Sequence, residues 1–436
     1  MLLSFSVQNF MSFKQTQSLN MTAGKYKKHT NHLNTVCGRN VLAAAGIYGA
    51  NASGKSNFCK AISFSRDIAT GRNPRINSSK LYFRIDGQGQ NQPGVFEYRI
   101  AVNEKSYDYG FAINYKSGRI VSEWLVRIEG KKENCLFERN HEDDECMIEG
   151  SYGKLAFFDN FKGDISEPLS RKTILSQISY YAKRSSEWMM EIKAVFDWFE
   201  RLCVIMPGTR NLRRNEVAGE NEIREFFERE LLDFDTGILG LKNGAETFDF
   251  DEWKMPDDFK EEVINEVGKH RFMADGVEGN IELSQTEEGD VIYQKVLMDH
   301  GNTDDLFEMC DESDGTRRLF DFIPMLRKRP ESCVFVVDEL DLSMHTNLVA
   351  AFLERFFKYH ENDRSQIIFT THDTNIMDLD LLRQDEIWFT ERNSDHATEI
   401  YSLDKYKVRF DKVINQDYLI GRFGAIPRIL AEFQEE

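Results

Sequence analysis

The stretch GIYGANASGKSNF, residues 46–58, decides the fold that we expect for this chain. It matches the spacing G-x-x-x-x-G-K-[ST] at every fixed position, which is filled by Gly49, Gly54, Lys55 and Ser56. The apolar run NVLAAAGIYG before the glycine-rich segment predicts a buried strand, and the apolar periodicity after it predicts a helix. Strand, loop and helix therefore follow one another in the order that a phosphate-binding P-loop requires.

The P-loop also predicts which residues bind the phosphates of a nucleotide. Its glycines let successive backbone N–H groups turn towards the phosphates, and the start of the helix adds a partial positive charge. The lysine reaches the terminal phosphates, and the hydroxyl after it is a magnesium ligand. We therefore expect contacts from one continuous segment, which consists of Gly49, Ala50, Asn51, Ala52, Ser53, Gly54, Lys55, Ser56 and Asn57.

Composition indicates a globular protein of the cytoplasm. The 436 residues are 41% hydrophobic and 12% aromatic, enough for a large core and for a division into two domains. Seven scattered cysteines without a C-x-x-C pair suggest neither a disulfide framework nor a zinc site. The opening MLLSFSVQNFMSF alternates like a strand, unlike a signal peptide. Since no apolar run approaches the ~20 residues that span a bilayer, we expect no membrane association.

The net charge of −18 opposes a surface that is basic throughout, which is the usual footprint of a dedicated nucleic-acid binder. Two short basic clusters, TRNLRR at 209–214 and KHR at 269–271, are candidate local patches for DNA or RNA, although such clusters are also ordinary solvated surface. The acidic run HEDDE at 141–145 is a similar case. It could bind a metal ion, but adjacent carboxylates in a loop usually form a solvated face.

The chain divides into three predicted segments. Residues 1–165 contain the P-loop and alternating runs typical of antiparallel strands, such as GVFEYRIAV and IVSEWLVRIE. Residues 166–245 are predicted to form a helical insertion, because 186–206 and 220–234 show helical apolar periodicity. Residues 246–436 begin with strands and then alternate between helix and strand. Sustained heptads are missing, so we expect no long coiled coil.

Within the insertion, the segment EWMMEIKAVFDWF is unusually aromatic. Burial in a core, a self-association face and a docking site for a partner are the three interpretations that this pattern allows.

Three further motifs in the last third carry chemistry. CVFVVDELD predicts a buried strand that ends in Asp338 and Glu339, where the aspartate can hold the magnesium hydration shell and the glutamate can polarise the attacking water. QIIFTTHD predicts a second buried strand, followed by His372, which would lie at the same sheet edge as Lys55 if the strands are parallel. DESDGTRRLFDFI places a serine and a glycine at the start of a helix.

Each of these motifs also has a structural interpretation. Acidic residues are common at strand ends, and a histidine just beyond a strand is more often structural than functional. Ser313 is a plausible N-cap of the helix. The alternative for Ser313 and Gly315 is that this helix N-terminus faces a phosphate bound to a second subunit.

Taken in this order, the motifs resemble those of ABC-type ATPases, in particular the soluble branch that includes the SMC, Rad50 and RecF proteins and the OLD-type ATPases. The opening FSVQNFMSFK looks like the first strand pair of that branch. The tail from DEIWFTERN to YLIGRFGAIPRI resembles the compact, stand-alone ATPases of bacterial phage-defence operons. The resemblance implies an α/β fold: an ABC-type ATPase head with a mixed sheet, formed by the two ends of the chain, and a central helical insertion.

The resemblance also implies roles for individual residues. ATP and Mg²⁺ would be the ligands, with Ser56 and Asp338 on the metal ion and Lys55 on the phosphates. Glu339 would be the catalytic base and His372 the switch histidine. The remaining assignments are Ser313 and Gly315 in the signature segment, and Leu340 to Ser343 as the D-loop with His345 just beyond it.

Two departures from the family pattern concern this site. Asp314 stands where many ABC proteins have glycine, and its charge would oppose a phosphate unless it points away or pairs with Arg317 or Arg318. The glutamine of the Q-loop has no clear position. Its candidates are Gln88, Gln90 and Gln92, which lie in a turn rich in glycine, glutamine and asparagine.

The function implied is that of a regulatory ATPase in an anti-phage defence complex. Two heads would enclose ATP, and the engaged state would sense a phage protein or nucleic acid and control an effector, a Toprim-like nuclease or a toxin. The main alternative is a RecF-like repair ATPase that clamps DNA directly. A transporter subunit and a small-molecule kinase explain the motifs less well.

Overall fold

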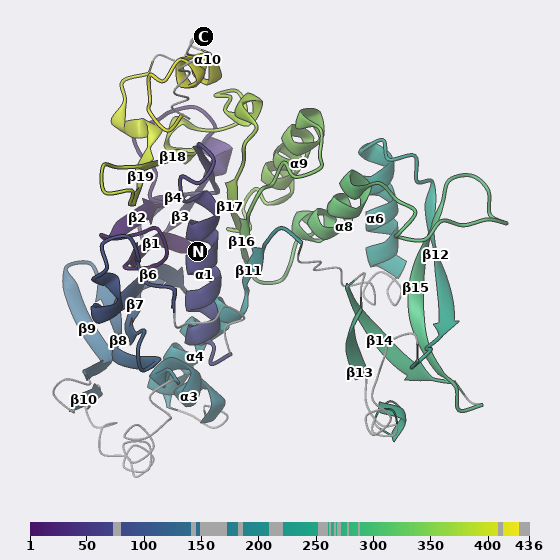
Figure 1. Cartoon of the computed structure of the whole chain (residues 1–436), viewed down its shortest axis with the longest axis horizontal. Coiled ribbons are helices and arrows are strands. Elements are labelled where there is room, and N and C mark those ends of the chain that lie inside the picture. The colour runs from purple at the N-terminus through teal and green to yellow at the C-terminus, as the bar shows by residue number, and fades with distance from the viewer. Residues whose placement is uncertain are drawn as a thin grey trace, which may run out of the picture. The chain divides into compact units, whose positions relative to one another are not determined.

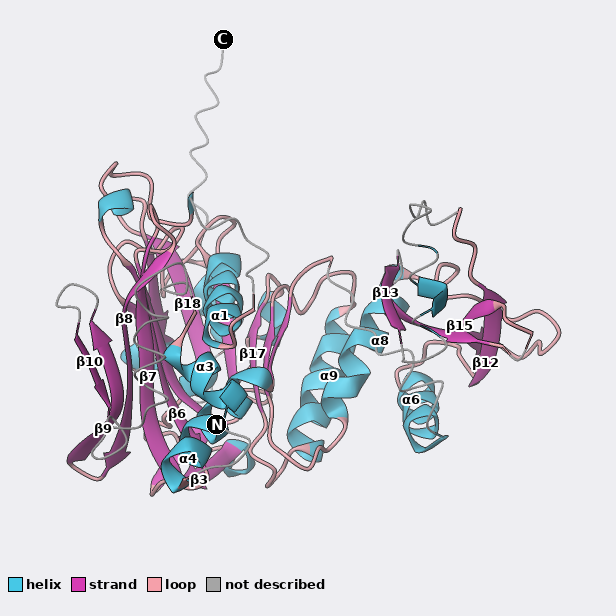
Figure 2. Cartoon of the chain, turned by 90° about the horizontal axis from the view of Figure 1, so that it is seen from below, coloured by secondary structure: helices cyan, strands magenta, loops and turns pink. Residues whose placement is uncertain are grey.

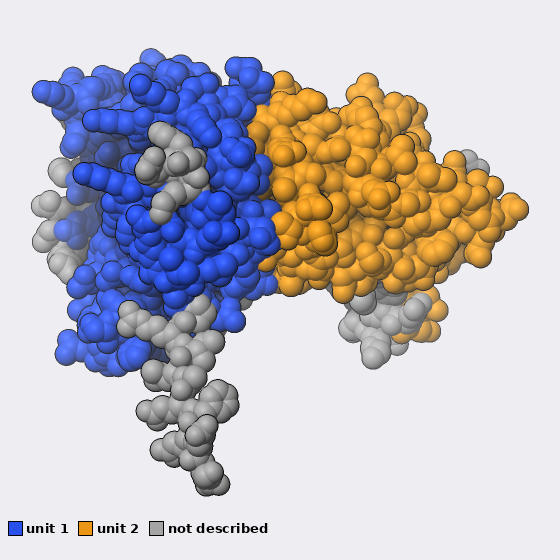
Figure 3. Space-filling view, turned by 90° about the horizontal axis from the view of Figure 1, so that it is seen from above, with its two compact units in different colours: residues 1–206, 329–340, 360–436 blue, residues 207–328, 341–359 orange. Residues whose placement is uncertain are grey.

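The computed structural model describes residues 1–72, 80–140, 145–148, 172–181, 186–208, 221–251, 260, 263–265, 267, 272–276, 279–286, 288–408 and 413–426. The chain forms two compact units (Figure 3). Unit 1 consists of Met1–Met206, Arg329–Leu340 and His360–Glu436, and unit 2 of Pro207–Lys328 and Asp341–Tyr359. The basic clusters at 209–214 and 269–271 lie outside the described residues, as do positions 141–144 of the acidic run.

The first sheet of unit 1 has six strands in the order β11-β16-β17-β5-β18-β19. Neighbours from β11 to β18 are parallel, whereas β19 pairs antiparallel with β18. Continuous apolar runs such as VFVV and QIIFT form its central strands because both faces of a parallel sheet are covered. The strands are Ala44–Gly49 (β5), Leu202–Ile205 (β11), Val334–Val337 (β16), Gln366–Thr370 (β17), Ile387–Arg392 (β18) and Thr398–Ser402 (β19).

The second sheet of unit 1 is antiparallel and has seven strands in the order β10-β9-β8-β7-β6-β1-β2. It confirms the antiparallel strands expected after the P-loop helix. The strands are Leu2–Gln8 (β1), Gln17–Asn20 (β2), Gly94–Val102 (β6), Lys105–Asn114 (β7), Arg119–Glu129 (β8), Lys132–Asn140 (β9) and Glu145–Ile148 (β10). A separate hairpin joins Leu33–Val36 (β3) to Arg39–Leu42 (β4), and a short helix, Ile414–Leu419 (α10), follows β19.

Helix α1, Lys55–Ala69, lies between the two sheets of unit 1 (Figures 1 and 2). On one side, the ring of Phe58 packs against Phe5 of β1 at a centroid distance of 5.4 Å. Towards the other sheet, Arg66 donates a hydrogen bond of 3.2 Å to the carbonyl oxygen of Leu202 in β11. The helix that begins at the P-loop is therefore held by both sheets.

The aromatic segment of the expected insertion is part of the unit 1 core. Helices α3 (Ile174–Tyr181) and α4 (Glu187–Glu200) belong to this unit. Trp198 and Phe199 are buried and pack against Tyr98 at 6.0 and 4.9 Å. Burial in a core, one of the three interpretations left open, is confirmed for this face of α4.

One secondary-structure expectation was wrong. The helix predicted over 186–206 ends at Glu200, and Leu202–Ile205 forms β11 instead. The four residues pair in parallel with Val334–Val337, so their apolar side chains are stabilised by a strand that is distant in the sequence. Helical periodicity alone could not separate this short apolar run from the end of the helix.

In its described residues, unit 2 combines a four-stranded antiparallel sheet, in the order β12-β15-β14-β13, with helices α6, α8 and α9. The strands are Gly240–Thr247 (β12), Phe272–Gly276 (β13), Gly279–Gln285 (β14) and Val291–Asp299 (β15). The helices are Asn221–Asp233 (α6), Asp314–Leu326 (α8) and Thr346–Tyr359 (α9). Phe227 of α6 packs against Phe320 of α8 at 5.8 Å, and the buried carboxylate of Glu230 accepts hydrogen bonds from Arg355 and Tyr359 of α9.

The predicted α/β class with a mixed sheet is confirmed. In the described part of the chain the longest helix has 15 residues, so a long coiled coil is not found there. None of the helices in the same residues is long and apolar enough to cross a membrane. The two units do not follow the boundaries predicted at 165 and 245, since α3 and α4 belong to unit 1 and α6 to unit 2.

Candidate functional site

Three neighbouring parallel strands of unit 1 end at one edge of the six-stranded sheet. β16 pairs with β17 with Val337 opposite Phe369, and β17 pairs with β5 with Thr370 opposite Ile47. The carboxyl ends of parallel strands meet at the same edge, which is where open α/β sheets bind their ligands. The P-loop, the Asp338-Glu339 pair and His372, which follow these three strands, are therefore brought to that edge.

The P-loop requires glycine at two positions for different reasons. Gly54 precedes α1 with a φ of +113°, a backbone conformation that residues with a side chain rarely adopt. A Cβ atom there would also lie 2.1 Å from the hydroxyl oxygen of Thr398. At Gly49 a Cβ atom would lie 2.4 Å from the backbone oxygen of Thr390. Both glycines are needed because strands β18 and β19 approach the loop closely.

Hydroxyl groups hold the P-loop against those strands. Ser53 Oγ lies 2.7 Å from Thr390 Oγ1, and Thr398 Oγ1 donates to the backbone oxygen of Ser53 at 2.8 Å. On the other side, Asn57 Nδ2 donates to Ser12 Oγ at 2.8 Å. The sequence analysis missed Ser12, Thr390 and Thr398. The threonines are single residues in two short strands, IWFTER and TEIYS, and no spacing motif marks them in the sequence.

The side chain of Lys55 is folded over the loop that precedes it. The residue is 5% exposed, and its ammonium donates to the backbone oxygens of Gly49 at 2.6 Å and Ala50 at 3.3 Å. A hydrogen bond from an ammonium to a charged phosphate oxygen is roughly twice as strong as one between neutral groups. Phosphate would therefore compete well with these carbonyl oxygens for the lysine.

Thr370, at the end of β17, fixes the two acidic residues that follow β16. Its Oγ1 donates to Asp338 Oδ1 at 2.7 Å and accepts the backbone N–H of Glu339 at 2.8 Å. The backbone oxygen of Thr370 also accepts the N–H of Leu340 at 2.9 Å. Glu339 has a φ of +53°, a left-handed conformation that costs free energy and is often found at functional sites. Asp338 is buried, whereas Glu339 is only partly buried.

Replacing Thr370 with valine tests this arrangement. Valine keeps the shape but removes both hydrogen bonds, so we expect the free energy of unfolding to fall by about 1–3 kcal/mol. Urea unfolding followed by tryptophan fluorescence measures the loss, since Trp124, Trp188, Trp198 and Trp388 all belong to unit 1. Thr35→Val, which removes an exposed hydrogen bond to Asn40, is the matched control. Equal stability of the two variants would contradict the role given to Thr370.

The donor set at this edge fits a magnesium ion. Burial and the nearby charge of Asp338 raise the pKa of the Cys59 thiol, so this face of α1 is turned towards the aspartate. Ser56 lies three residues before Cys59, on the same face of the helix. A hydroxyl and a carboxylate are the oxygen ligands that Mg²⁺ takes beside substrate phosphates. In the described residues no group of three His, Cys, Asp or Glu side chains forms a complete metal site.

The positions of His372 and of the three candidate glutamines support their expected roles less clearly than the positions of the P-loop and of Asp338 and Glu339 do. His372 is exposed two residues beyond β17, after Thr371, whose N–H bonds to the backbone oxygen of Ile47 at 3.3 Å. The three glutamines are exposed in a turn that Asn9 holds through hydrogen bonds to the backbone of Gly89 and Gln92. Among the contacts of the described residues, none joins these amides to the P-loop. The Q-loop therefore stays unassigned.

The signature segment belongs to unit 2, and the expected N-cap is confirmed there. Ser313 Oγ accepts the backbone N–H of Thr316 at 3.1 Å, where α8 begins. The carboxylate of Asp314 pairs with Arg317 at 2.5 Å, one of the two partners expected to offset its charge. A Cβ atom on Gly315 would lie 2.7 Å from the backbone oxygen of Ser343. Glycine thus allows the start of α8 to lie against the predicted D-loop.

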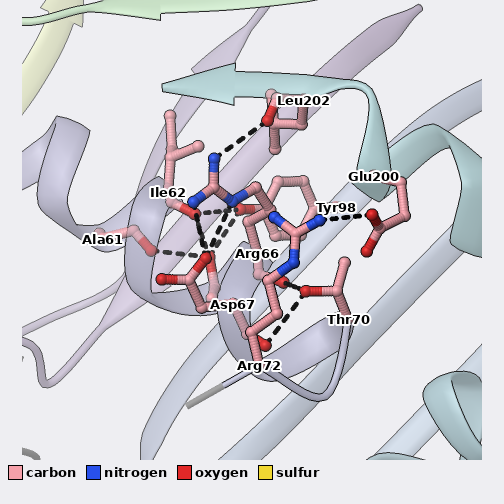
Figure 4. Close-up of polar contacts among 10 residues, drawn as sticks. Ala61, Ile62, Arg66, Asp67, Thr70, Arg72, Tyr98, Glu200 and Leu202 are labelled. Atoms are coloured by element: carbon pink, nitrogen blue, oxygen red, sulfur yellow. Dashed lines mark hydrogen bonds and ion pairs between the residues drawn. The ribbon is translucent and has the colours of Figure 1, made fainter. Parts of the chain in front are cut away.

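Polar contacts fix the end of α1 that is far from the P-loop (Figure 4). Arg66 pairs with Asp67 at 2.6 Å and bonds to β11, while Arg72 pairs with Glu200 at the end of α4. The hydroxyl of Tyr98 in β6 lies 2.6 Å from Ser65 Oγ. Both ends of the P-loop helix are therefore tied to other elements of unit 1.

No curated protein matches the sequence. Among solved structures the chain is similar to the SMC head domain from Thermotoga maritima, with 12% identity, a TM-score of 0.37, and coverage of 92% of this chain and 98% of that chain. A family model described as "AAA domain, putative AbiEii toxin, Type IV TA system" matches residues 44–378, which include the P-loop, Asp338, Glu339 and His372. Since this match spans well over half of the 436 residues, the chain belongs to that family of AAA-domain proteins.

Proposed function

We propose that this protein is an ATP-binding and ATP-hydrolysing regulatory subunit of an anti-phage defence complex. One observation carries the ATPase part of the proposal: the P-loop, Asp338-Glu339 and His372 meet at one edge of a parallel sheet. Glu339 is held there in a costly backbone conformation by Thr370. Such a conformation is retained when function requires it, and a catalytic base must face the attacking water.

The proposed chemistry uses each group at this edge. Lys55 binds the terminal phosphates, and its burial limits the positions that its ammonium can take. Ser56 and Asp338 hold Mg²⁺, which supplies positive charge against the phosphate oxygens. Glu339 accepts a proton from the water that attacks the γ-phosphate, and His372 contacts the same phosphate. Water and ATP become ADP and inorganic phosphate.

The regulatory part of the proposal is that the protein changes between two states, separated copies and an engaged assembly. Two copies would enclose ATP, with Ser313 and Gly315 of one copy at the phosphates bound by the other. The cap at Ser313 marks the start of α8, where backbone N–H groups can bind a phosphate. The pairing of Asp314 with Arg317 offsets a negative charge that would repel that phosphate. ATP would then favour the engaged state through contacts that separated copies cannot make.

The effector partner is inferred from the family. Its description names a putative AbiEii toxin and a type IV toxin–antitoxin system. A toxin–antitoxin system has two components, which supports a partner protein beside this ATPase. We propose a Toprim-like nuclease as the effector, with a phage protein or nucleic acid as the trigger and the cytoplasm as the location.

Mass determination of the Glu339→Gln variant tests this proposal. The variant is purified with and without ATP-Mg²⁺, alone and co-expressed with the product of the neighbouring gene. A dimer or larger assembly that needs ATP and captures the neighbour's product is the expected result, because blocked hydrolysis should hold the engaged state. A variant that stays monomeric and instead retains nucleic acid in a salt-dependent manner would replace the proposal with the DNA-clamp alternative.

A further inference from the structure

The signature segment of unit 2 is held by one histidine that the sequence analysis did not single out. His300 follows the last residue of β15, at the beginning of the loop that leads to α8. Its Nε2 lies 2.7 Å from Glu312 Oε1, and its Nδ1 lies 3.0 Å from the backbone oxygen of Gly237. The ring also packs edge-on against Phe307, with a centroid distance of 4.7 Å. One side chain therefore joins three segments of unit 2.

Each of these segments has a definite place. Gly237 lies in the turn between α6 and β12, and Phe307 lies in the middle of the loop, where it pairs with Met298 of β15 through two backbone hydrogen bonds of 2.9 Å. Glu312 is the residue immediately before the N-cap, Ser313. Its side chain is 6% exposed, so its carboxylate needs a donor to offset the cost of burial. The ring of His300 is the hydrogen-bond partner of this carboxylate.

Both ring nitrogens of His300 lie within hydrogen-bond distance of an oxygen atom, one on the side chain of Glu312 and one on the backbone of Gly237. The two contacts fix the orientation of the ring between the signature segment and the turn after α6. Phe307 and the remaining neighbours leave 27% of the histidine side chain exposed.

We infer that His300 is a positioning residue for the signature segment ESDGT, residues 312–316. It acts through Glu312 to hold Ser313 and Gly315 where a phosphate bound to a second copy could be recognised. Because His300 directly follows β15, its side chain links the four-stranded sheet to the signature segment. The role in assembly rests on the proposed function, whereas the positioning itself does not.

Hydrogen exchange of the ATP-free protein tests the positioning directly. In His300→Ala, the amides of residues 310–318 should exchange about tenfold faster, since the partly buried hydrogen bond to Glu312 is lost. The P-loop segment 49–58 should keep its wild-type rate. His300→Gln retains an N–H donor for Glu312 and should restore most of the protection. Removal of the exposed His396 by alanine is the matched control.

A second measurement separates this inference from the proposed function. In the Glu339→Gln background, His300→Ala should raise the ATP concentration needed for half-maximal assembly about tenfold, while ATP affinity of the separated protein stays unchanged. Unchanged exchange at 310–318, faster exchange throughout unit 2, or failure of His300→Gln to restore protection would each overturn the positioning role. If Glu339→Gln alone never assembles, the proposed function fails, but local exchange at 310–318 still decides the role of His300.

Discussion

Glutamine in place of Glu339 is expected to lower the rate of ATP hydrolysis by about 10²- to 10⁴-fold, the usual contribution of a general base. The amide cannot accept the proton of the attacking water, but it keeps the size of the side chain and the backbone bond to Thr370. ATP binding should therefore stay close to that of the wild type. Phosphate release under saturating ATP measures the rate, and titration with a fluorescent ATP analogue measures the affinity.

Glu361 provides the control for this variant. It is an exposed glutamate of the same unit, and its replacement by glutamine removes the same charge without touching the sheet edge. Glu361→Gln should hydrolyse ATP at the wild-type rate. If Glu339→Gln does so as well, another group activates the water, and the assignment of Glu339 as the base is wrong.

Alanine in place of Gly54 is expected to weaken ATP binding at least about 100-fold, which corresponds to ~2.8 kcal/mol. The φ of +113° is strained for any residue with a side chain, and the new Cβ atom would lie 2.1 Å from Thr398 Oγ1. The loop must move away from β19 to relieve this clash. Its backbone N–H groups would then no longer point together at the phosphates. Affinity for the same fluorescent analogue is the measurement.

Gly38 is the matched control for the backbone effect. It also has a positive φ, +71°, but a Cβ atom there would meet nothing within 4 Å. Gly38→Ala should cost a little stability and leave ATP affinity unchanged. Wild-type affinity in Gly54→Ala would show that the close approach of β19 does not shape the P-loop.

The sequence alone identified those parts of the site whose chemistry is local. The spacing from Gly49 to Ser56 specifies a loop that starts a helix, and an apolar run that ends in Asp338 and Glu339 specifies a buried strand with acidic residues at its end. The N-cap at Ser313 is local in the same way, since it depends on one hydroxyl and an N–H three residues later. Membership of a P-loop ATPase family followed from these motifs, and the family match confirms it.

The tertiary structure decided everything that depends on pairing between distant segments. The sequence pattern of Leu202–Ile205 predicts the end of a helix, but the segment forms a strand because it pairs in parallel with β16. Thr370 shows its role only when β17 lies next to β16, and Thr398 only when β19 approaches the P-loop. The contact of His300 with Glu312 likewise needs a loop folded back on β15. Hydrogen bonds and packing act over a few ångströms in space. When they join residues that are distant in the sequence, they produce no periodic pattern in it, so they can be identified only from the folded structure.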